Sequence, residues 1–251
     1  MIKITFETFS FILFILINLF IIINLFLHKE NFLQKNGYLI ENNIISDVEC
    51  EKINKIIEKE LQNPNRKEGN IRNKENRKDL LLPQNKTIKS LIDKISKRYN
   101  NILKKYLGKK YELVECSSFI SYPGCKAQDW HKDVSCDRKS TRAKLITIAI
   151  TLDDINDKMG PLEVYPKRHK ILNSEFNKFN ELDQKEVENF LFKNKYISKK
   201  LSCPKGSIII WDSKIIHRGG TNKSSKIRPM FYFSLLESNK EKPDGPVYSI
   251  L

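Results

Sequence analysis

The stretch Gln128-Asp129-Trp130-His131-Lys132-Asp133 places two metal-capable side chains at the spacing of one strand face. His131 and Asp133 are two residues apart, and residues two apart on a β-strand point to the same side of the sheet. An imidazole and a carboxylate placed side by side can bind one metal ion from one direction. The stretch therefore predicts half of a metal site on an extended segment, with a second imidazole supplied from elsewhere in the chain.

The second imidazole must come from a small set, because the chain has only four histidines: His28, His131, His169 and His217. His28 closes a hydrophobic run near the N-terminus, which makes it a poor partner for His131. His169 and His217 therefore remain as the candidates. A chance pairing of His and Asp on one strand is the plain alternative to a metal site.

A second distinctive block runs from Lys205 to Asn222 and contains His217, and Arg228 follows it. A strand ending at His217, a turn and a further strand would bring the Arg228 guanidinium close to the metal. Arginine is suited to planar carboxylates, which it binds through paired hydrogen bonds. Two imidazoles and one carboxylate leave coordination positions open, as in non-heme iron(II) oxygenases, whereas a structural zinc site has four protein ligands. A keto acid chelating such an iron needs a cation such as Arg228 for its far carboxylate.

The chain has 251 residues and a formal net charge of +15, which bear on its domain size and on its class of partner. The length suits one large domain with a sizeable core. The Lys residues are interspersed with Asn, Ile and Glu along the whole chain and form no dense run with aromatic residues. This pattern is typical of a solvated cationic surface and argues against a nucleic-acid partner. The five cysteines include no Cys-x-x-Cys spacing, which excludes a zinc ribbon and a disulfide framework.

Residues 9–27 form an uncharged apolar run with only three polar side chains. The length and composition of this run are typical of one membrane-spanning helix. A cleaved signal peptide is the competing interpretation, but no small-residue cleavage site follows Leu27. We therefore predict an N-terminal membrane anchor over residues 1–29 and one domain over residues 30–251. The flanking charges do not decide on which side of the membrane that domain lies.

Hydrophobic periodicity predicts helices at three places in the chain. A capping box at Ser46-Asp-Val-Glu49 opens a helix that reaches about Leu61, with its apolar side chains on one face. Residues 87–107 show the same periodicity, and residues 174–194 form a later helix. Residues 63–78 are rich in Asn, Arg and Lys without periodicity, and we expect them to form an exposed loop.

The second half of the chain is dominated by short strand-like segments separated by turns. These segments lie at residues 112–122, 144–152, 162–165, 197–201, 207–211, 214–217 and 229–236. Several short strands at this spacing favour a closed sandwich or jelly roll. The chain is therefore predicted to be a mainly β domain of the α+β class, with helices flanking its sheets.

Four segments of this chain resemble the phytanoyl-CoA dioxygenase-like family of iron(II)/2-oxoglutarate-dependent dioxygenases. The family's Gln-x-x-His-x-Asp pattern is similar to residues 128–133, and its central Gly-Pro-Leu-x-Val-x-Pro segment is similar to Gly160-Pro-Leu-Glu-Val-Tyr-Pro166. Its distal histidine and arginine block resembles residues 206–222 with Arg228, and its opening resembles Asn36-Gly-Tyr-Leu-Ile40. Any one of these motifs is weak, but four in the family's order form a specific signature.

The resemblance covers about residues 30–237 and implies a double-stranded β-helix, a cupin-like jelly roll with helices packed against one sheet. It assigns His131, Asp133 and His217 as the metal ligands and places the family's equivalent of His169 outside the metal shell. It also implies iron(II) as the metal, 2-oxoglutarate as the cosubstrate and O2 as the oxidant.

Further site residues follow from the same resemblance. Arg228 is implied as the anchor for the far carboxylate of 2-oxoglutarate, and Gln128 and Thr147 are weaker candidates for further cosubstrate contacts. The carboxylate of Asp133 argues for hydroxylation over halogenation, because related halogenases carry a small residue at that position. The chain departs from the family's pattern at residues 167–168, where Lys and Arg replace a Gly and a Ser.

These features together predict a membrane-anchored hydroxylase of an unidentified organic substrate. A small molecule, an acyl compound or a glycan would fit, and the positive net charge favours an anionic one. A non-catalytic anchored binding protein that keeps the fold is one alternative, and a cupin-like enzyme using zinc or manganese is another. The substrate does not follow from the family, because function depends on the pocket rather than on the fold.

Overall fold

The computed structural model describes residues 6–69, 75–134, 144–169, 184–238 and 240, with only the backbone described at 6–10 and 21–26. The helices are α1 (Phe6–Asn36), α2 (Asp47–Gln62), α3 (Lys86–Arg98), α4 (Asn100–Leu107), the 3-10 helix η1 (Asp157–Met159) and α5 (Gln184–Lys193). The strands are β1 (Tyr38–Glu41), β2 (Arg77–Leu81), β3 (Tyr111–Ser121), β4 (Leu145–Thr151), β5 (Leu162–Val164), β6 (Lys199–Lys200), β7 (Ile208–Asp212), β8 (His217–Gly219) and β9 (Arg228–Glu237).

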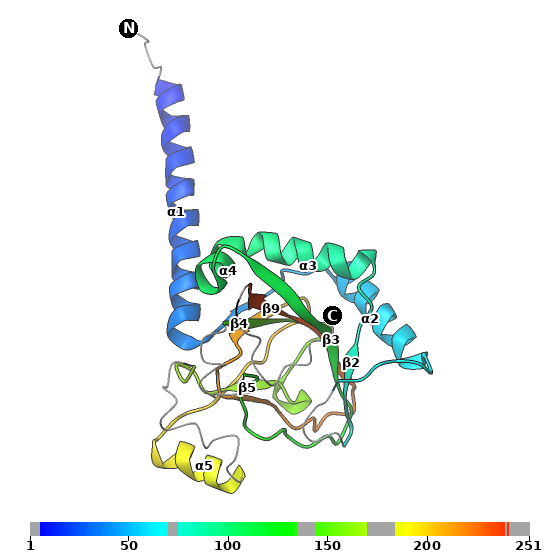
Figure 1. The fold of residues 1–251 in the computed structure, drawn as a ribbon. Coiled ribbons are helices and arrows are strands. Elements are labelled where there is room, and N and C mark those ends of the chain that lie inside the picture. The colour runs from blue at the N-terminus through cyan, green and yellow to red at the C-terminus, as the bar shows by residue number, and fades with distance from the viewer. Residues whose placement is uncertain (1–5, 70–74, 135–143, 170–183, 239, 241–251) are drawn as a thin grey trace.

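Two antiparallel sheets make up the body of the domain (Figure 1). The larger sheet has the strand order β1-β7-β4-β9-β3-β2, and the smaller has the order β6-β5-β8. Most neighbouring strands are far apart in the sequence: β9 pairs with both β3 and β4, and Arg228 lies opposite Ser121. Mainly antiparallel sheets with flanking helices, arranged in keeping with a cupin-like jelly roll, agree with the predicted fold class.

The central strand β4 shows how the two faces of the larger sheet are used. It is buried along its whole length. Ile146, Ile148 and Ile150 pack into the cluster shared with the helices, whereas Ala149 packs into the cluster between the two sheets. Because side chains alternate along a strand, Thr147 shares the face of Ala149 and points between the sheets. The space between the sheets therefore receives polar side chains as well as apolar ones.

Helices α3 and α4 lie over the outer face of the larger sheet (Figure 1). The sequence predicted one helix over residues 87–107, but the chain forms two helices with a break at Tyr99. Tyr99 has φ −101° and ψ 12°, outside helical geometry, and it is 2% exposed. The hydrophobic periodicity continues across the break, so the sequence pattern did not reveal it.

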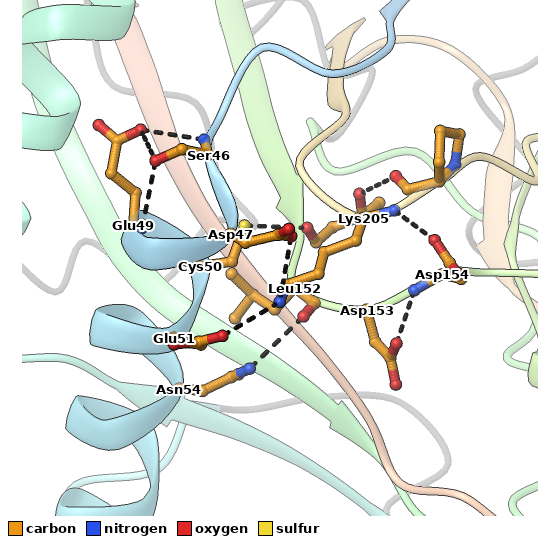
Figure 2. A network of polar contacts seen from close by, with 12 residues as sticks. Ser46, Asp47, Glu49, Cys50, Glu51, Asn54, Leu152, Asp153, Asp154 and Lys205 are labelled. Carbon is orange, nitrogen blue, oxygen red and sulfur yellow. Dashed lines mark hydrogen bonds and ion pairs between the residues drawn. The ribbon is translucent and has the colours of Figure 1, made fainter.

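Helix α2 begins with the capping box that the sequence predicted (Figure 2). The Ser46 hydroxyl accepts from the Glu49 amide, and the Glu49 carboxylate accepts from the Ser46 amide. Further along the helix, Asn54 donates to the carbonyl of Leu152 at 3.4 Å, in the turn that follows β4. The Asn54 contact attaches the helix to the end of the central strand.

The prediction of an exposed loop over residues 63–78 is wrong at its C-terminal end. Arg77 and Lys78 belong to β2, and the Arg77 side chain is 5% exposed. Arg77 and Asp79 lie on the buried side of β2. A strand whose inward face carries Arg and Asp has no hydrophobic alternation, so the sequence pattern could not reveal it. Residues 70–74 of the expected loop lie outside the described residues.

Two other predicted elements differ from the structure in their boundaries. The strand expected at residues 214–217 begins at His217 and runs to Gly219. The helix expected over residues 174–194 is seen as α5, and its earlier part (174–183) lies outside the described residues. Four cysteines are described, and they are buried and form no disulfide with one another: Cys50, Cys116, Cys125 and Cys203. Cys136 lies outside the described residues.

Helix α1 projects away from the two sheets (Figure 1). Its side chains at residues 11–20 are all exposed, with Phe20 at 68%. Its C-terminal part contacts the domain, since Leu33 is fully buried and Lys29 pairs with Glu41 at 2.7 Å. Within the described part of the chain, no helix combines the length and the apolar character needed to cross a membrane. The predicted transmembrane helix is therefore not supported.

Candidate metal centre

His131 and His217 are brought side by side by a short antiparallel bridge. The His131 amide donates to the His217 carbonyl at 3.0 Å, and the His217 amide donates to the His131 carbonyl at 2.9 Å. Directly opposed residues on antiparallel strands point to the same face, and the two ring centroids are 4.4 Å apart. Asp133 follows on the same segment, where its amide donates to the carbonyl of Ser213 at 3.0 Å.

The ligand atoms of these three residues converge on one point. Oδ1 of Asp133 lies 3.2 Å from Nε2 of His217 and 3.8 Å from Nε2 of His131. The three donor atoms all lie within 4.8 Å of one another, and no other described His, Cys, Asp or Glu joins the group. Bonds of about 2 Å place neighbouring ligands of one metal ion about 3 Å apart, so the triad can hold a single ion.

The second nitrogen of each imidazole faces a backbone carbonyl. His131 Nδ1 lies 2.7 Å from the carbonyl of Asp129, and His217 Nδ1 lies 3.0 Å from the carbonyl of Ile215. A carbonyl can only accept, so each Nδ1 carries the proton of the neutral ring. In this tautomer the Nε2 of both rings is unprotonated and can serve as a metal ligand on the side of Asp133.

The protonation of the triad reflects the close approach of its members. Burial by itself would raise the pKa of Asp133, but His217, His131 and a hydrogen bond from Trp211 hold that pKa below its ordinary value. Burial would also lower the pKa of His217, whereas Asp133 raises it above its ordinary value. The imidazole and the carboxylate thus shift each other's pKa in the directions expected of two groups of opposite charge in close contact.

Trp211 orients the metal-binding carboxylate. Its indole Nε1 donates to Oδ2 of Asp133 at 3.2 Å, and its ring centroid lies 5.9 Å from that of His217. Because Oδ2 is held in this way, Oδ1 is turned toward the two imidazoles. A tryptophan in an apolar strand is typical of a core position, so no sequence signal marks this contact.

The donor set and its surroundings fit an iron(II) site better than a structural zinc site. Two imidazoles and one carboxylate occupy one side of the ion and leave the remaining positions for a cosubstrate and O2. The Asp133 side chain is 26% exposed, against 5% for His217, so solvent reaches the triad from the carboxylate side. A structural zinc site would be closed by a fourth protein ligand.

Arg228 opens β9 with its side chain between the sheets, 3% exposed. Its Nη2 donates to the hydroxyl of Ser121 at 2.7 Å, and its Nη1 lies 3.1 Å from the sulfur of Met230. The Arg228 Nε has no hydrogen-bond partner among the described residues. None of the ion pairs formed within the described chain involves this guanidinium. The side chain is thus buried, charged and able to accept an anionic ligand.

The family description "Phytanoyl-CoA dioxygenase (PhyH)" matches residues 33–230, which is most of the chain and nearly the range expected from the motifs. The chain belongs to this family. No curated protein matches the sequence.

Solved structures share the fold of this family member at low sequence identity. The non-heme α-ketoglutarate-dependent carbocyclase SnoK, from nogalamycin biosynthesis, is 15% identical with a TM-score of 0.70, covering 87% of this chain and 86% of SnoK. The epimerase SnoN, in complex with Fe3+, α-ketoglutarate and nogalamycin RO, is 9% identical with a TM-score of 0.66, covering 89% and 88%. HygX from Streptomyces hygroscopicus, with nickel, 2-oxoglutarate and hygromycin B bound, is 11% identical with a TM-score of 0.62, covering 84% and 87%. At these identities the likeness establishes the fold.

The two weaker cosubstrate candidates are engaged in contacts within the domain. The Gln128 side-chain oxygen accepts from the amide of Gly219 at 2.9 Å, which fastens the His131 segment to β8. The Thr147 hydroxyl lies 3.2 Å from that of Ser213 and 3.1 Å from that of Ser234. Both side chains are therefore placed near the metal-binding strands, and their contact with a cosubstrate stays a prediction.

His169 lies outside the triad. It is 6% exposed, and its Nε2 is 3.1 Å from the carbonyl of Gln34 at the end of α1. Nearby, Lys167 stands where the family pattern has a glycine, and it adopts a φ of +68°. A side chain in this left-handed region costs about 1–2 kcal/mol, so the turn at Lys167 carries some strain.

Proposed function

We propose that this chain is an iron(II)- and 2-oxoglutarate-dependent oxygenase that hydroxylates a small organic molecule. The observation that carries the proposal is the convergence of His131, Asp133 and His217 in a domain that also buries Arg228, which has no acidic partner among the described residues. Membership of the phytanoyl-CoA dioxygenase family supports it. So do the printed descriptions of SnoN and HygX, which name 2-oxoglutarate or its synonym α-ketoglutarate.

Each residue has a defined task in this proposal. His131 and His217 hold the metal through Nε2, because their Nδ1 protons are engaged by carbonyls. Asp133 supplies the third ligand atom and one negative charge, and Trp211 keeps the other carboxylate oxygen turned away. Iron(II) with bound 2-oxoglutarate supplies the oxygen-activating chemistry, which no side chain can perform alone. Arg228 binds the far carboxylate of the cosubstrate and so sets its orientation.

Hydroxylation is the outcome that we favour for the reaction. Asp133 keeps a carboxylate at the position where related halogenases have a small residue. The carbocyclase and the epimerase among the structural neighbours act with the same cosubstrate, so the pocket decides the final product. The substrate that we propose is a small molecule, and the net charge of +15 favours an anionic one.

Release of succinate from 2-oxoglutarate tests this function. Purified protein with iron(II), ascorbate and O2 is expected to release succinate, at a rate raised by the true member of a panel of small organic acids, glycans and acyl compounds. Asp133→Ala should abolish the release, whereas Asp93→Ala, an exposed carboxylate on α3, should leave it unchanged. Tight metal binding without turnover of any member would instead indicate a binding protein, and activity restored only by zinc or manganese would indicate another metalloenzyme.

The membrane localisation inferred from residues 9–27 stays a prediction. The exposed apolar side chains at 11–20 support it, because soluble domains rarely leave a large apolar surface uncovered. Fractionation of cells producing the full chain, compared with a chain that starts at Lys29, would decide the matter. Recovery of both proteins in the same fraction would contradict an anchor.

A further inference from the structure

A second buried guanidinium lies beside Arg228. In the larger sheet, Arg77 on β2 and Arg228 on β9 are paired with the same residue of β3, Ser121. Both reach its hydroxyl: Arg228 Nη2 donates at 2.7 Å and Arg77 Nε at 3.5 Å. The two side chains are 3% and 5% exposed. Three adjacent strands thus bring two like charges to one hydroxyl inside the domain.

Neither charge is neutralised by the part of the protein that the structure describes. Arg77 Nη2 donates to the carbonyls of Lys126 and Gly220, at 3.1 and 3.2 Å, and to the sulfur of Cys125 at 3.4 Å. No ion pair with a carboxylate among the described residues includes Arg77. Arg77 Nη1 and Arg228 Nε are buried without a hydrogen-bond partner among those residues. Each guanidinium therefore has a spare N–H group in the same region.

Two buried like charges without an anion are unfavourable. Burial lowers the pKa of Arg77, and burial together with the neighbouring Arg77 lowers the pKa of Arg228 to about 10. Removing charges from water is costly unless a partner of opposite sign is supplied. A bound carboxylate would supply that partner and would accept the spare N–H groups.

The Arg77 guanidinium also lies next to the strand that carries a metal-binding residue. A Cβ atom added to Gly219 would lie 3.6 Å from Arg77 Nη2. Gly219 is two residues beyond His217 on β8, so the two positions share one face of the strand. A side chain at position 219 would project toward Arg77 and would meet the side-chain oxygen of Gln128 at 2.8 Å, so Gln128 fills the space beside the glycine.

We infer that Arg77 is a second cation of the cosubstrate site and that, together with Arg228, it holds the far carboxylate of 2-oxoglutarate. The inference rests on the proposed function. Arg228 approaches from β9 and Arg77 from β2, so the two guanidinium groups can bind different oxygens of one carboxylate. The pair would select keto acids with a second carboxylate over those that end in a methyl group.

Binding measurements with nickel(II) test the assignment without turnover. Wild-type protein, Arg77→Gln, Arg77→Lys, Arg228→Gln and the exposed control Arg98→Gln are titrated with 2-oxoglutarate and with 2-oxobutyrate, which lacks the far carboxylate. Arg77→Gln is expected to weaken 2-oxoglutarate binding about 10- to 100-fold, as the loss of one charge-assisted hydrogen bond does, and to leave 2-oxobutyrate binding unchanged. Arg77→Lys keeps the charge and should fall between wild type and Arg77→Gln, and Arg98→Gln should match wild type.

The outcomes separate the inference from the function on which it rests. If Arg228→Gln weakens 2-oxoglutarate binding and Arg77→Gln does not, Arg77 is no part of the site. Equal weakening for both keto acids in Arg77→Gln would show a structural role instead, as would loss of folding in Arg77→Gln with wild-type affinity in Arg77→Lys. Failure of the wild-type protein to bind 2-oxoglutarate in the presence of metal would overturn the proposed function itself.

Discussion

Two buried carboxyl groups inside the domain contact the same tyrosine hydroxyl. The Tyr232 hydroxyl lies 3.0 Å from Asp79 and 3.1 Å from Glu115, and both carboxyls are buried. One phenol has a single proton to donate, so a proton on either acid would let that acid donate to the phenol oxygen. In agreement, burial raises the pKa of Glu115 to about 8 and that of Asp79 to about 7.

These two acids predict how stability depends on pH. The folded state keeps their protons at pH values where the unfolded chain, with ordinary carboxyl pKa values near 4, has lost them. Raising the pH from about 4 to 8 therefore favours unfolding, by up to about 1.4 kcal/mol per pH unit for each proton. Glu115→Gln should flatten this fall, measured by thermal denaturation of the metal-free protein between pH 5 and 8. An unchanged pH profile would show that Glu115 is already ionised in the folded state.

The hydrogen bond from Trp211 to Asp133 predicts how the metal affinity depends on this tryptophan. Trp211→Phe keeps an aromatic ring in β7 but removes the hydrogen bond to Asp133. We expect the affinity for nickel(II) or iron(II) to fall about 10- to 100-fold, as is usual when a group that orients a metal ligand is lost. Trp130→Phe is the matched control, because the Trp130 ring lies against Tyr165 and Arg218. Equal affinity in the two variants would remove Trp211 from the metal centre.

Two glycines show how turns hold the strands and helices of this fold in register. Gly206, in the turn before β7, has a φ of +75°, and a Cβ atom there would lie 2.1 Å from the carbonyl oxygen of Ile45. Its carbonyl accepts from the amides of Ile44 and Ile45, which ties this turn to the segment that precedes α2. Gly124 has a similar φ of +80°, but its nearest neighbour, an atom of Asn76, is 3.9 Å away.

This contrast predicts unequal costs for the same substitution. Gly124→Ala should cost only the backbone strain of a side chain at positive φ, about 1–2 kcal/mol. Gly206→Ala adds a collision with backbone that cannot move freely, so we expect it to lower the melting temperature at least twice as far. Thermal denaturation of the two variants measures the difference. Equal melting temperatures would mean that the Ile45 segment shifts at little cost.

The molecule as a whole divides into the two-sheet domain and a projecting helix (Figure 1). The described side chains at 11–20 are exposed, whereas Leu33 is fully buried in the core shared with α2 and α3. The boundary between the two parts thus lies between these positions. Residues 11–20 of α1 contribute apolar surface rather than packing, and exposed apolar surface of this kind promotes association.

Removal of residues 1–26 should therefore leave the domain intact. We expect the melting temperature of the truncated chain to stay within about 2 °C of that of the full chain, which corresponds to less than about 1 kcal/mol. The truncated chain should also show less aggregation in light scattering. A chain that begins at residue 38 lacks Leu33 and should melt at a clearly lower temperature. Unfolding of the chain that lacks only residues 1–26 would show that the apolar run packs on the domain.

Much of the fold and the triad could be predicted from local patterns. The capping box at Ser46, the alternating apolar strands and the spacing of His131 and Asp133 depend on residues close in the chain, and local geometry alone places them. Four motifs in order then indicated the family, and with it the partnership of His217. The break at Tyr99 and the burial of Arg77 escaped prediction, because neither leaves a periodic signal.

The sequence by itself determined which residue types are available: two imidazoles, one carboxylate and one arginine, in an order typical of one family. Tertiary structure alone decided which side chains meet. Arg77 and Arg228 are joined through Ser121 because β2, β3 and β9 are neighbours in the larger sheet, although far apart in the chain. Trp211 reaches Asp133 because the Asp133 amide is bonded to the carbonyl of Ser213, just beyond β7. Such contacts depend on strand order and register, which arise from packing of the whole domain and not from any local stretch.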